Sequence, residues 1–401
     1  MKILVVSQYF YPEDFKINDV VEYLLGAGHD VNVLTAYPNY PGGSFFDGYG
    51  FFDSYPKNFK GARVYRTPII PRKNNSINLL LNYLTFPIFS RTRAMKIQQR
   101  FKPDVVLGYQ LSPIWSVFPA TILKNRFKVP FVLWCLDLWP ESFLSNFSYR
   151  NFIIDRYVSF SSEQIYRSAD FLAVTTKSFR SQLAKISDRS EGDISFLPNW
   201  AEDIFMEIPK KSFTLNSELF NVVFAGNIGD SQGLDVLINA ARLTKKQNIV
   251  WHLFGEGRYK GKLRQSAERL NLSNIIFHGR IDLNQIPSIY SESNALLLTL
   301  KPKQGFSRTI PGKFAGYLTS GKPIISNIEG EVKTVIEQYK LGDTFSGNSS
   351  EELAKVAMKI KAYSKTELDE ISQNSKKYYK NHFAKDKVLG DLERILIAAK
   401  L

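Results

Sequence analysis

The chain has 401 residues, of which 44% are hydrophobic and 22% are charged, a composition that excludes a disordered, collagen-like or coiled-coil protein. At roughly 100 to 200 residues per domain, this length predicts two or three domains, and the net charge of +14 falls mostly in one interval described below. The single cysteine, Cys135, excludes an internal disulfide and cysteine-based metal sites, so we expect a reducing compartment, by default the cytoplasm.

The first half of the chain alternates short apolar runs with segments of helical period. This alternation is typical of a parallel sheet covered by helices. A helix over residues 18–27 is expected to end at Gly28. No secretory signal begins the sequence, and no run reaches the roughly 20 apolar residues needed to cross a bilayer. The predicted strands span 2–7, 30–36, 62–69, 104–109, 130–136, 171–175 and 194–197.

Residues 54–103 form a basic interval with no acidic residue, and aromatic residues are interleaved with its bases. Three interpretations stay open: a solvated face over core aromatics, a surface for anionic lipid or a lipid-linked phosphate, and a nucleic-acid surface. The third is disfavoured because no zinc-finger, RNA-recognition or basic-zipper signature accompanies the charge. The eleven bases are Lys57, Lys60, Arg63, Arg66, Arg72, Lys73, Arg91, Arg93, Lys96, Arg100 and Lys102.

A polar segment, residues 137–142, follows the predicted strand that ends near Cys135. Open α/β sheets bind ligands at the carboxyl ends of their strands, so Asp137 is predicted to accept hydrogen bonds from hydroxyl groups or to act as a base. Glu141 either joins this site or caps the helix that follows. Trp134 and Trp139 are candidates for a platform on which a sugar ring stacks.

The strand and helix pattern restarts near residue 220 and predicts a second doubly wound domain. Its strands are expected at 221–225, 249–254, 275–278, 295–300 and 323–326, and the last 50 residues read as helices only. The join is expected between Asn199 and Leu219. We therefore predict domains over 1–205 and 206–385, followed by a terminal helix over 386–401 that can pack back on the first domain.

Several common motifs are absent or broken. No G-x-G-x-x-G follows the first strand, which disfavours a dehydrogenase. Residues 316–322 spell G-x-x-x-x-G-K, but Pro323 stands where a P-loop needs Ser or Thr. The histidines, at positions 29, 252, 278 and 382, lack the spacing of a ligand pair, so no metal is expected.

Glycine-rich strand exits of the second half are the candidate phosphate and base sites. Gly226, Asn227 and Gln232 lie between a strand and a helix, where free backbone N–H groups suit a phosphate. The alternative is that these glycines only make a tight turn. Gly255 follows the next predicted strand, and Gly279 and Arg280 follow the one after, so both exits are placed beside a nucleotide base.

The segment before the predicted helix 312–320 is the candidate diphosphate cradle. It combines a helix N-terminus with hydroxyl groups and two cations, which together favour an anion. The residues are Ser307, Arg308, Thr309 and Lys313.

Seven segments in this order resemble glycosyltransferase family 4, a group of retaining, nucleotide-sugar-dependent enzymes with the GT-B fold. The resemblance covers nearly the whole chain and is greatest to the branch that builds bacterial O-antigen and capsule units, including transferases similar to those for N-acetylfucosamine. The segments are ILVVSQYFYPE at 3–13, GHDV at 28–31, PNYPGG at 38–43, DLWPES at 137–142, LPNW at 197–200, AGNIG at 225–229 and IPGK at 310–313.

This resemblance implies two Rossmann-like domains facing a central cleft, with the acceptor on the first domain and the donor nucleotide on the second. It places Gly226, Asn227 and Gln232 near the donor diphosphate and Gly279 and Arg280 near the base. Residues 307–309 and Lys313 fall near the phosphates. No metal or other cofactor is implied.

The chain departs from the wider family at its charged positions. Arg308 and Gly316 stand where many members carry an E-x7-E pair, and Asn227 and Gln232 replace the usual Arg and Lys. Arg308 and Lys313 are therefore expected to compensate the diphosphate charge. Without a nucleophile constellation, we favour front-face retaining transfer, in which the leaving oxygen takes the acceptor proton. The expected catalytic residues are Asp137, Glu141, Arg308 and Lys313.

We expect the protein to transfer a sugar to a polyprenyl-diphosphate-linked saccharide in surface-polysaccharide synthesis. The expected donor is an amino sugar linked to UDP. The interval 54–103 would bring the protein to the anionic inner face of the membrane as a peripheral protein. The alternatives are a GT-B sugar-nucleotide epimerase and a catalytically inactive nucleotide-binding scaffold. A nucleic-acid-binding role is not expected.

Overall fold

The computed structural model describes residues 1–50, 53, 55–73, 75–146, 151–207, 212–301 and 309–401. The chain forms two compact units, which are described separately below. Unit 1 comprises Met1–Leu197 and Leu389–Leu401, and unit 2 comprises Pro198–Val388. The first crossing between the units therefore falls just before the expected interval of 199–219, and the terminal segment of unit 1 begins slightly later than 386.

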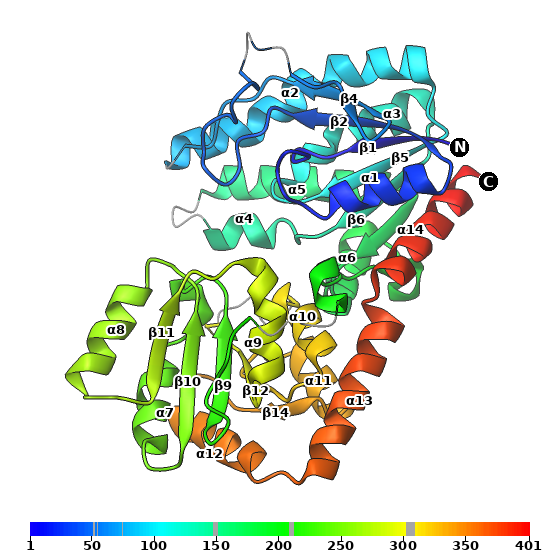
Figure 1. The fold of residues 1–401 in the computed structure, drawn as a ribbon. Helices are drawn as coiled ribbons and strands as arrows, with labels where there is room; N and C mark the ends of the chain where they lie inside the picture. The colour runs from blue at the N-terminus through cyan, green and yellow to red at the C-terminus, as the bar shows by residue number, and fades with distance from the viewer. Residues whose placement is uncertain (51–52, 54, 74, 147–150, 208–211, 302–308) are drawn as a thin grey trace. The chain divides into compact units, whose positions relative to one another are not determined.

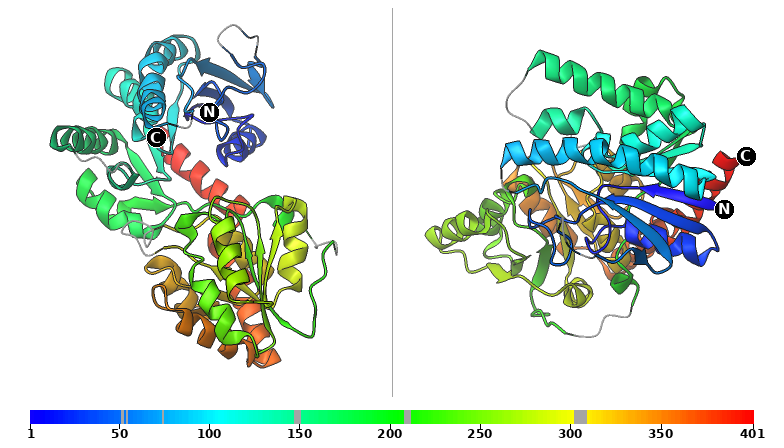
Figure 2. Two further views of the ribbon diagram at one scale, coloured as in Figure 1. Left: turned by 90° about the vertical axis from the view of Figure 1, so that its left-hand side faces the viewer. Right: turned by 90° about the horizontal axis from the view of Figure 1, so that it is seen from above.

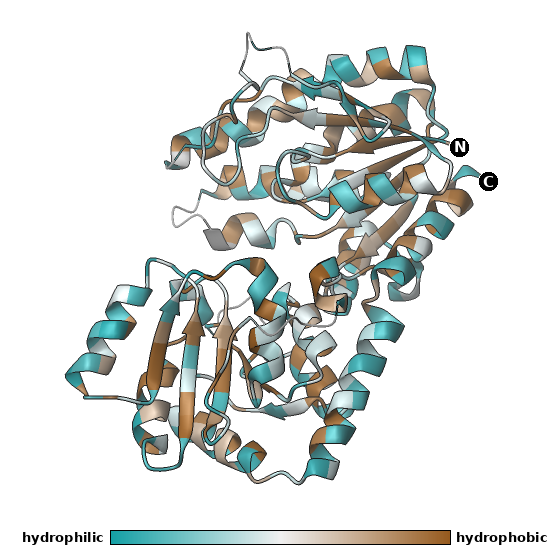
Figure 3. Ribbon diagram, viewed as in Figure 1, coloured by the Kyte–Doolittle hydropathy of each residue, from teal (hydrophilic) through white to brown (hydrophobic). Residues whose placement is uncertain are grey.

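Unit 1 is built on a sheet that is parallel except for its short first pair, β3 and β4. Its central strands are continuous apolar runs because helices cover both faces, and Figure 3 shows these strands in brown. The strand order is β3 (Asn58–Phe59), β4 (Ala62–Thr67), β2 (Asp30–Ala36), β1 (Lys2–Val6), β5 (Val105–Gln110), β6 (Phe131–Cys135), β7 (Phe171–Val174) and β8 (Ile194–Phe196).

The helices of unit 1 divide between the two faces of this sheet (Figures 1 and 2). On one face α2, α3, α5 and α6 pack in succession, and α1 and α14 lie together on the other. The bounds are α1 (Ile17–Gly26), α2 (Ser76–Phe101), α3 (Phe118–Phe127), α4 (Glu141–Asn146), α5 (Phe152–Ser168), α6 (Arg180–Ser187) and α14 (Lys385–Lys400).

Helix α14 is joined to the N-terminal part of unit 1 by Glu393. The Glu393 carboxylate accepts a hydrogen bond from the Tyr23 hydroxyl at 3.0 Å and pairs with His29 Nε2 at 2.8 Å. Leu392 and Leu396 of the same helix are fully buried. Residues 364 and 370 positions apart in the sequence therefore pair within unit 1.

Unit 2 is a second doubly wound unit, and in the described residues the strands of its sheet pair in parallel. The strand order is β11 (Ile275–Gly279), β10 (Ile249–Phe254), β9 (Phe220–Ala225), β12 (Ala295–Leu298), β13 (Ile324–Ser326) and β14 (Gly342–Thr344). The helices are α7 (Val236–Thr244), α8 (Lys260–Arg269), α9 (Ile286–Glu292), α10 (Lys313–Ser320), α11 (Glu331–Gln338), α12 (Ser350–Lys361) and α13 (Lys365–His382). The two α/β units confirm the predicted fold class, and the segment after Ser350 is helical as predicted.

Within the described part of the chain, no helix has both the length and the apolar character that a bilayer span requires.

Candidate functional site

Two glycines bring the exits of β9 and β10 into direct contact. Gly226 and Gly255 have φ values of +146° and +136°, which a residue with a side chain rarely adopts. A Cβ atom added to Gly255 would lie 1.9 Å from the carbonyl oxygen of Gly226. The Gly255 N–H donates to the Gly279 carbonyl at 2.6 Å, so three strand exits form one continuous backbone surface.

Lys313, the first residue of α10, reaches this glycine-lined surface. Its ammonium lies 3.9 Å from the ring centre of Phe224 and donates to Gln232 Oε1 at 3.0 Å. A Cβ atom on Gly226 would lie 3.0 Å from the same nitrogen. The structure therefore brings together three of the residues expected to hold the diphosphate, namely Gly226, Gln232 and Lys313.

The electrostatics of Lys313 are unusual for a lysine. Burial lowers the pKa of its ammonium from 10.5 to about 7. Among the described residues, no carboxylate lies within ion-pair distance of this nitrogen, and its recorded partners are an amide oxygen and an aromatic ring. A half-buried cation without a counter-ion is unfavourable, so an anion at this position would be bound favourably. The N-terminal N–H groups of α10 add positive potential at the same place.

Asn227 and Arg280 are placed differently from Lys313. The Asn227 side chain folds over its own loop, because a Cβ atom on Gly229 would lie 2.9 Å from Asn227 Nδ2 and one on Gly257 would lie 2.8 Å from its Oδ1. Arg280 follows β11 and is exposed. The geometry thus gives Asn227 a role in shaping the loop and leaves Arg280 at the surface of the same strand edge.

Part of the predicted cradle lies outside the described residues. This holds for Ser307 and Arg308, whereas Thr309 is described and half-buried. Gly316 lies inside α10, where an added Cβ atom would be 3.4 Å from the Phe205 ring. Little room therefore remains at the second position of the E-x7-E pair.

Two contributors to the candidate site were missed by the sequence analysis. Phe224 was read only as a strand residue, and nothing in an apolar run signals that its ring contacts a cation. Asn327, after β13, accepts from the Leu300 N–H and donates to the Leu300 carbonyl, both at 3.0 Å. This pair of bonds fixes the exit of β12, and neighbouring Lys301 forms an ion pair with Asp230.

In unit 1, Asp137 lies at the exit of β6 and is held by hydroxyl groups. Its carboxylate accepts hydrogen bonds from Ser112 and Ser142, and its carbonyl accepts one from Gln110 Nε2 at 2.9 Å. Glu141 begins α4 and accepts a hydrogen bond from Gln182. Both carboxylates are therefore oriented by side chains far apart in the sequence.

The prediction that Trp134 and Trp139 form a platform for a sugar ring is wrong. The exposed fractions of Trp134 and Trp139 are 0% and 1%, so neither ring offers a face to a sugar. Their indole nitrogens form hydrogen bonds inside the protein. Trp134 Nε1 donates to the Leu197 carbonyl at 3.0 Å, and Trp139 Nε1 donates to Ser112 Oγ at 2.9 Å. Trp139 belongs to the hydrophobic core cluster beneath Asp137, and Trp134 packs against Tyr109 with ring centres 5.4 Å apart.

A buried carboxylate, Glu13, organises the exits of β1 and β2 and was not singled out from the sequence. Its Oε1 accepts from the backbone N–H groups of Asn39 and Tyr40 at 2.9 and 2.8 Å, and its Oε2 accepts from that of Phe10 at 3.2 Å. Burial raises the pKa of Glu13 to about 7, against the lowering effect of these bonds. Glu13 therefore ties together two loops at the carboxyl edge of the unit 1 sheet.

Two histidines that are distant in the sequence meet on neighbouring strands. His252 Nδ1 lies 2.9 Å from His278 Nε2, and His252 Nε2 lies 3.0 Å from Asn221 Oδ1. Burial lowers the pKa of His252 to about 4, which favours the neutral ring. No cluster of three or more metal-binding side chains occurs among the residues that the structure describes.

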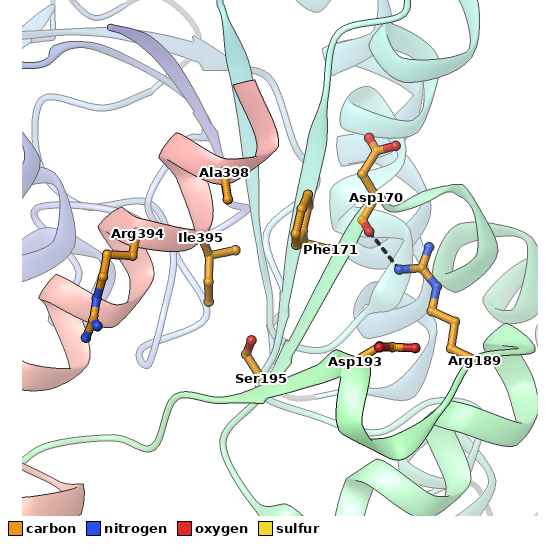
Figure 4. Close-up of a pocket in the computed structure, with 8 residues that line it drawn as sticks. All are labelled: Asp170, Phe171, Arg189, Asp193, Ser195, Arg394, Ile395 and Ala398. Carbon is orange, nitrogen blue, oxygen red and sulfur yellow. Dashed lines mark hydrogen bonds between the residues drawn. The ribbon is translucent and has the colours of Figure 1, made fainter. Parts of the chain in front are cut away.

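A hollow in unit 1 lies near the amino-terminal ends of β7 and β8, and Figure 4 shows its lining residues. It is lined by Asp170, Phe171 and Arg189 near β7, and by Arg394 and Ile395 of α14, among others. Arg189 in this hollow already forms a hydrogen bond within the protein, because it donates to the carbonyl of Asp170 at 2.7 Å. Ligands of open α/β sheets bind at the carboxyl ends of the strands, so this hollow is not the candidate site.

Two Rossmann-like units, of which the second carries a cationic cradle at its strand exits, define the class of two-domain nucleotide-binding α/β proteins. Residues 16–200 match the family model described as Glycosyl transferase 4-like domain, and residues 220–361 match Glycosyl transferases group 1. The two models together match most of the chain, which belongs to glycosyltransferase family 4 with the GT-B fold.

The curated relatives have low sequence identity to this chain but match most of its length. The chain is 24% identical to the putative colanic acid biosynthesis glycosyl transferase WcaI of Escherichia coli over 86% of this chain and 87% of that protein. It is also 24% identical to the probable glycosyltransferase WbjE of Pseudomonas aeruginosa, over 72% of this chain and 74% of that protein.

Solved structures of low sequence identity share the fold. HepE of Anabaena, crystallised with UDP, has a TM-score of 0.69 at 13% identity, with 99% of this chain and 100% of that chain covered. Sucrose-phosphate synthase of Thermosynechococcus elongatus has a TM-score of 0.73 at 15% identity, with 99% of each chain covered. These matches support the GT-B fold of this chain.

Proposed function

We propose that the protein transfers a sugar with retention from a UDP-linked donor, an amino sugar in the first instance, to a polyprenyl-diphosphate-linked saccharide in surface-polysaccharide synthesis. The observation that carries the proposal is Lys313, a half-buried ammonium without an acidic partner among the described residues, set against the glycine-lined exits of β9 and β10. A nucleoside diphosphate supplies the missing negative charge and accepts hydrogen bonds from backbone N–H groups.

The relatives support the choice of donor and pathway. HepE was crystallised with UDP and with UDP-glucose, and the names of WcaI and WbjE describe a colanic acid biosynthesis transferase and a probable glycosyltransferase. A uridine donor and a polysaccharide product are therefore the first to test for this chain.

The proposed reaction proceeds on one face of the donor sugar. The acceptor hydroxyl oxygen bonds to the anomeric carbon, the bond from that carbon to the diphosphate breaks, and the leaving diphosphate oxygen takes the acceptor proton. Lys313 and Arg308 stabilise the negative charge that grows on the diphosphate. Asp137 orients the acceptor hydroxyl, and Glu141 supports the loop that carries Asp137. No metal is proposed.

The experiment combines a panel of UDP-sugars with a synthetic polyprenyl-diphosphate saccharide and follows the product by mass spectrometry. Lys313→Ala is expected to lower turnover by more than about tenfold, because it removes charge stabilisation from the transition state. Lys333→Ala, which removes a half-exposed lysine of α11 that pairs with Glu329, is the matched control and is expected to retain full turnover.

The alternatives give distinct results in the same assay. Conversion of the donor sugar without any acceptor would indicate a sugar-nucleotide epimerase. Tight UDP binding without conversion of any donor would indicate an inactive scaffold. Turnover of Lys313→Ala equal to that of the wild type would remove the residue on which the proposed mechanism depends.

We further propose that α2 brings the protein to the anionic inner face of the cell membrane. One face of α2 is buried through Phe86, Ala94 and Ile97. The opposite face is exposed and apolar over its first half, and basic residues follow in the second half, which is typical of helices that lie at a membrane surface. The exposed apolar residues are Ile77, Leu80, Leu81, Leu84, Ile88 and Phe89, and the bases are Arg91, Arg93, Lys96 and Arg100.

Sedimentation with phosphatidylglycerol vesicles tests this surface. Leu81→Ser combined with Ile88→Ser is expected to weaken binding by about tenfold or more, because two apolar side chains no longer insert into the membrane. The matched control is Phe152→Ser with Phe160→Ser, which removes exposed apolar residues from α5 outside residues 54–103. Absence of wild-type binding at low salt, or loss of binding in the α5 variant only, would contradict the assignment to α2.

A further inference from the structure

Arg72 lies in the segment after β4, at the carboxyl edge of the unit 1 sheet, and its backbone is held by a buried amide network. The Arg72 N–H donates to Asn39 Oδ1 at 3.2 Å, and Asn82 Nδ2 donates to the same oxygen at 3.2 Å. Asn82 Oδ1 in turn accepts from Gln8 Nε2 at 2.9 Å. The network joins the segments after β1, β2 and β4 to α2, so the position of Arg72 is well defined.

The guanidinium of Arg72 rests on aromatic rings. Its Nη1 donates to the Tyr9 hydroxyl at 3.3 Å, and its central carbon lies 5.3 Å from the ring centre of Tyr40. Phe15 stacks on Tyr9 with ring centres 5.0 Å apart and lies 5.4 Å from Tyr40. These rings hold the side chain by cation–π contact and leave most of its N–H donors available.

Arg72 has no acidic partner among the described residues. Within them, its guanidinium forms one hydrogen bond, to the Tyr9 hydroxyl. Arg66, from the preceding strand, is different: it is buried, and it donates to the carbonyls of Ala36 and Tyr11. Arg66 therefore has a structural role. The guanidinium of Arg72 is fixed in place but uncompensated, which is the arrangement of an anion-binding arginine.

Arg72 shares its edge of the sheet with Asp137. Burial raises the pKa of the Tyr83 phenol on α2. The Arg72 guanidinium lowers this pKa and the Asp137 carboxylate raises it, so both groups act electrostatically on the phenol. Tyr83 also lies 6.2 Å from Trp139, measured between ring centres, in the core beneath Asp137.

We propose that Arg72 binds a phosphate group of the acceptor at the same sheet edge as Asp137. This inference rests on the proposed function, in which the acceptor saccharide is carried on a diphosphate. The planar guanidinium presents paired N–H donors to two phosphate oxygens, and the aromatic rings behind it restrict its rotation. The site lies within unit 1 and is separate from the donor diphosphate cradle at Lys313.

Calorimetric titration of the full chain with geranyl diphosphate and with geraniol tests this site. Saturating UDP is present throughout to fill the donor cradle. The wild type is expected to bind the diphosphate about 10- to 100-fold more tightly than the alcohol, as charged hydrogen bonds predict, and Arg72→Gln is expected to abolish this preference. Arg72→Lys, which keeps the charge but loses the planar fork, is expected to retain part of it.

Arg63→Gln is the matched control, because Arg63 is an exposed arginine of β4 whose guanidinium lies over Tyr65. It is expected to keep the full preference for the diphosphate. Hydrogen exchange of the unit 1 strands verifies that each variant is folded around the substitution, and UDP binding verifies the donor cradle in unit 2.

Three results would overturn the proposal: equal binding of the two lipids by the wild type, an unchanged preference in Arg72→Gln, or binding of glucuronic acid that depends on Arg72 without any preference for the diphosphate. The third would assign the arginine to an acidic sugar. Failure to transfer sugar from any UDP donor would count against the proposed function, whereas diphosphate binding at Arg72 is measured without catalysis.

Discussion

At the scale of single residues, we expect Lys313 to couple binding of the proposed diphosphate to proton uptake. Its pKa is about 7 in the free protein, and a bound diphosphate is expected to raise it. UDP affinity should therefore fall by up to about tenfold for each pH unit above 7, until the pKa of the bound state is reached. Calorimetry from pH 6 to 9 measures this slope, and Lys313→Met should remove it.

The same lysine lowers the stability of the unliganded fold. Because its folded pKa is depressed below 10.5, its contribution to stability is present above pH 10.5 and is lost as pH falls towards 7. Lys313→Met should therefore raise the free energy of unfolding of unit 2 by about 1–3 kcal/mol at pH 6, where the wild type buries a charge. Urea unfolding without nucleotide tests this, and a less stable variant would show that the ammonium has a stabilising partner.

Glu13 has the opposite pH dependence. Its folded pKa is raised from 4.5 to about 7, so its contribution to stability is present below pH 4.5 and is lost as pH rises to 7. Glu13→Gln is expected to cost about 1–3 kcal/mol, because the amide nitrogen cannot accept the backbone N–H bonds that the carboxylate accepts.

Urea unfolding of unit 1 at pH 5 and pH 8 checks the prediction for Glu13. The cost of Glu13→Gln should be larger at pH 5 than at pH 8. Glu22→Gln, on the exposed side of α1 where Glu22 pairs with Lys60, is the control and should show no such difference. An equal cost at both pH values would mean that Glu13 does not titrate in this range.

Residue roles were predictable where a polar side chain follows a strand. Asp137 was predicted after a strand and Lys313 at a helix N-terminus, and the structure has both residues at these positions, while their roles stay predictions. Glu13, Phe224 and Arg72 were not assigned individual roles because their roles depend on contacts between distant segments. The tryptophan prediction was wrong because a position near a strand end does not determine which face a side chain occupies.

At the scale of elements, the packing of β9 against β10 depends on the absence of a side chain at Gly255. Gly255→Ala would place a methyl group 1.9 Å from the Gly226 carbonyl oxygen, in a backbone conformation that alanine rarely adopts. We expect a loss of about 1–3 kcal/mol in the stability of unit 2 and loss of UDP binding. Thermal unfolding with and without UDP measures both.

Gly261→Ala is the matched control for this substitution. Gly261 lies in α8 with no heavy atom within 4 Å of an added Cβ, so alanine should stabilise the helix by about 0.5–1 kcal/mol. If Gly255→Ala were tolerated equally well, the contact between the two strand exits would not be required for the fold.

Most strands were predictable because they are continuous apolar runs, such as β1 and β9. The structure adds β3 and β14, two and three residues long, which the sequence analysis did not contain. Neither has enough apolar residues for a periodic signal, and each forms by pairing with the free edge of a neighbouring strand. β14 pairs with β13, and β3 pairs with β4.

At the scale of the whole molecule, unit 1 is assembled from two separated parts of the chain. A variant that ends at Val388 would lack the buried side chains of Leu389, Leu392 and Leu396. We expect β1 and α1 to exchange their amide hydrogens much faster in this variant, while β9 and β10 keep their protection. Hydrogen exchange read by mass spectrometry checks this expectation.

Leu392→Ala gives a milder version of the same change. Truncating this fully buried side chain should cost unit 1 about 2–5 kcal/mol. Ile397→Ala on the exposed side of α14 is the control and should cost much less. Unchanged exchange in unit 1 of both the shortened chain and Leu392→Ala would mean that residues 389–401 are dispensable for its core.

The pairing of Glu393 with Tyr23 and His29 also sets the order of events during synthesis. When β1 and α1 leave the ribosome, the helix that covers them does not yet exist, and residues 198–388 must be translated first. Unit 2 can fold as soon as its own sequence has emerged, whereas the earlier-made unit 1 waits with part of its apolar surface uncovered. Exposure to chaperones or premature association therefore falls mainly on the N-terminal part of the nascent chain.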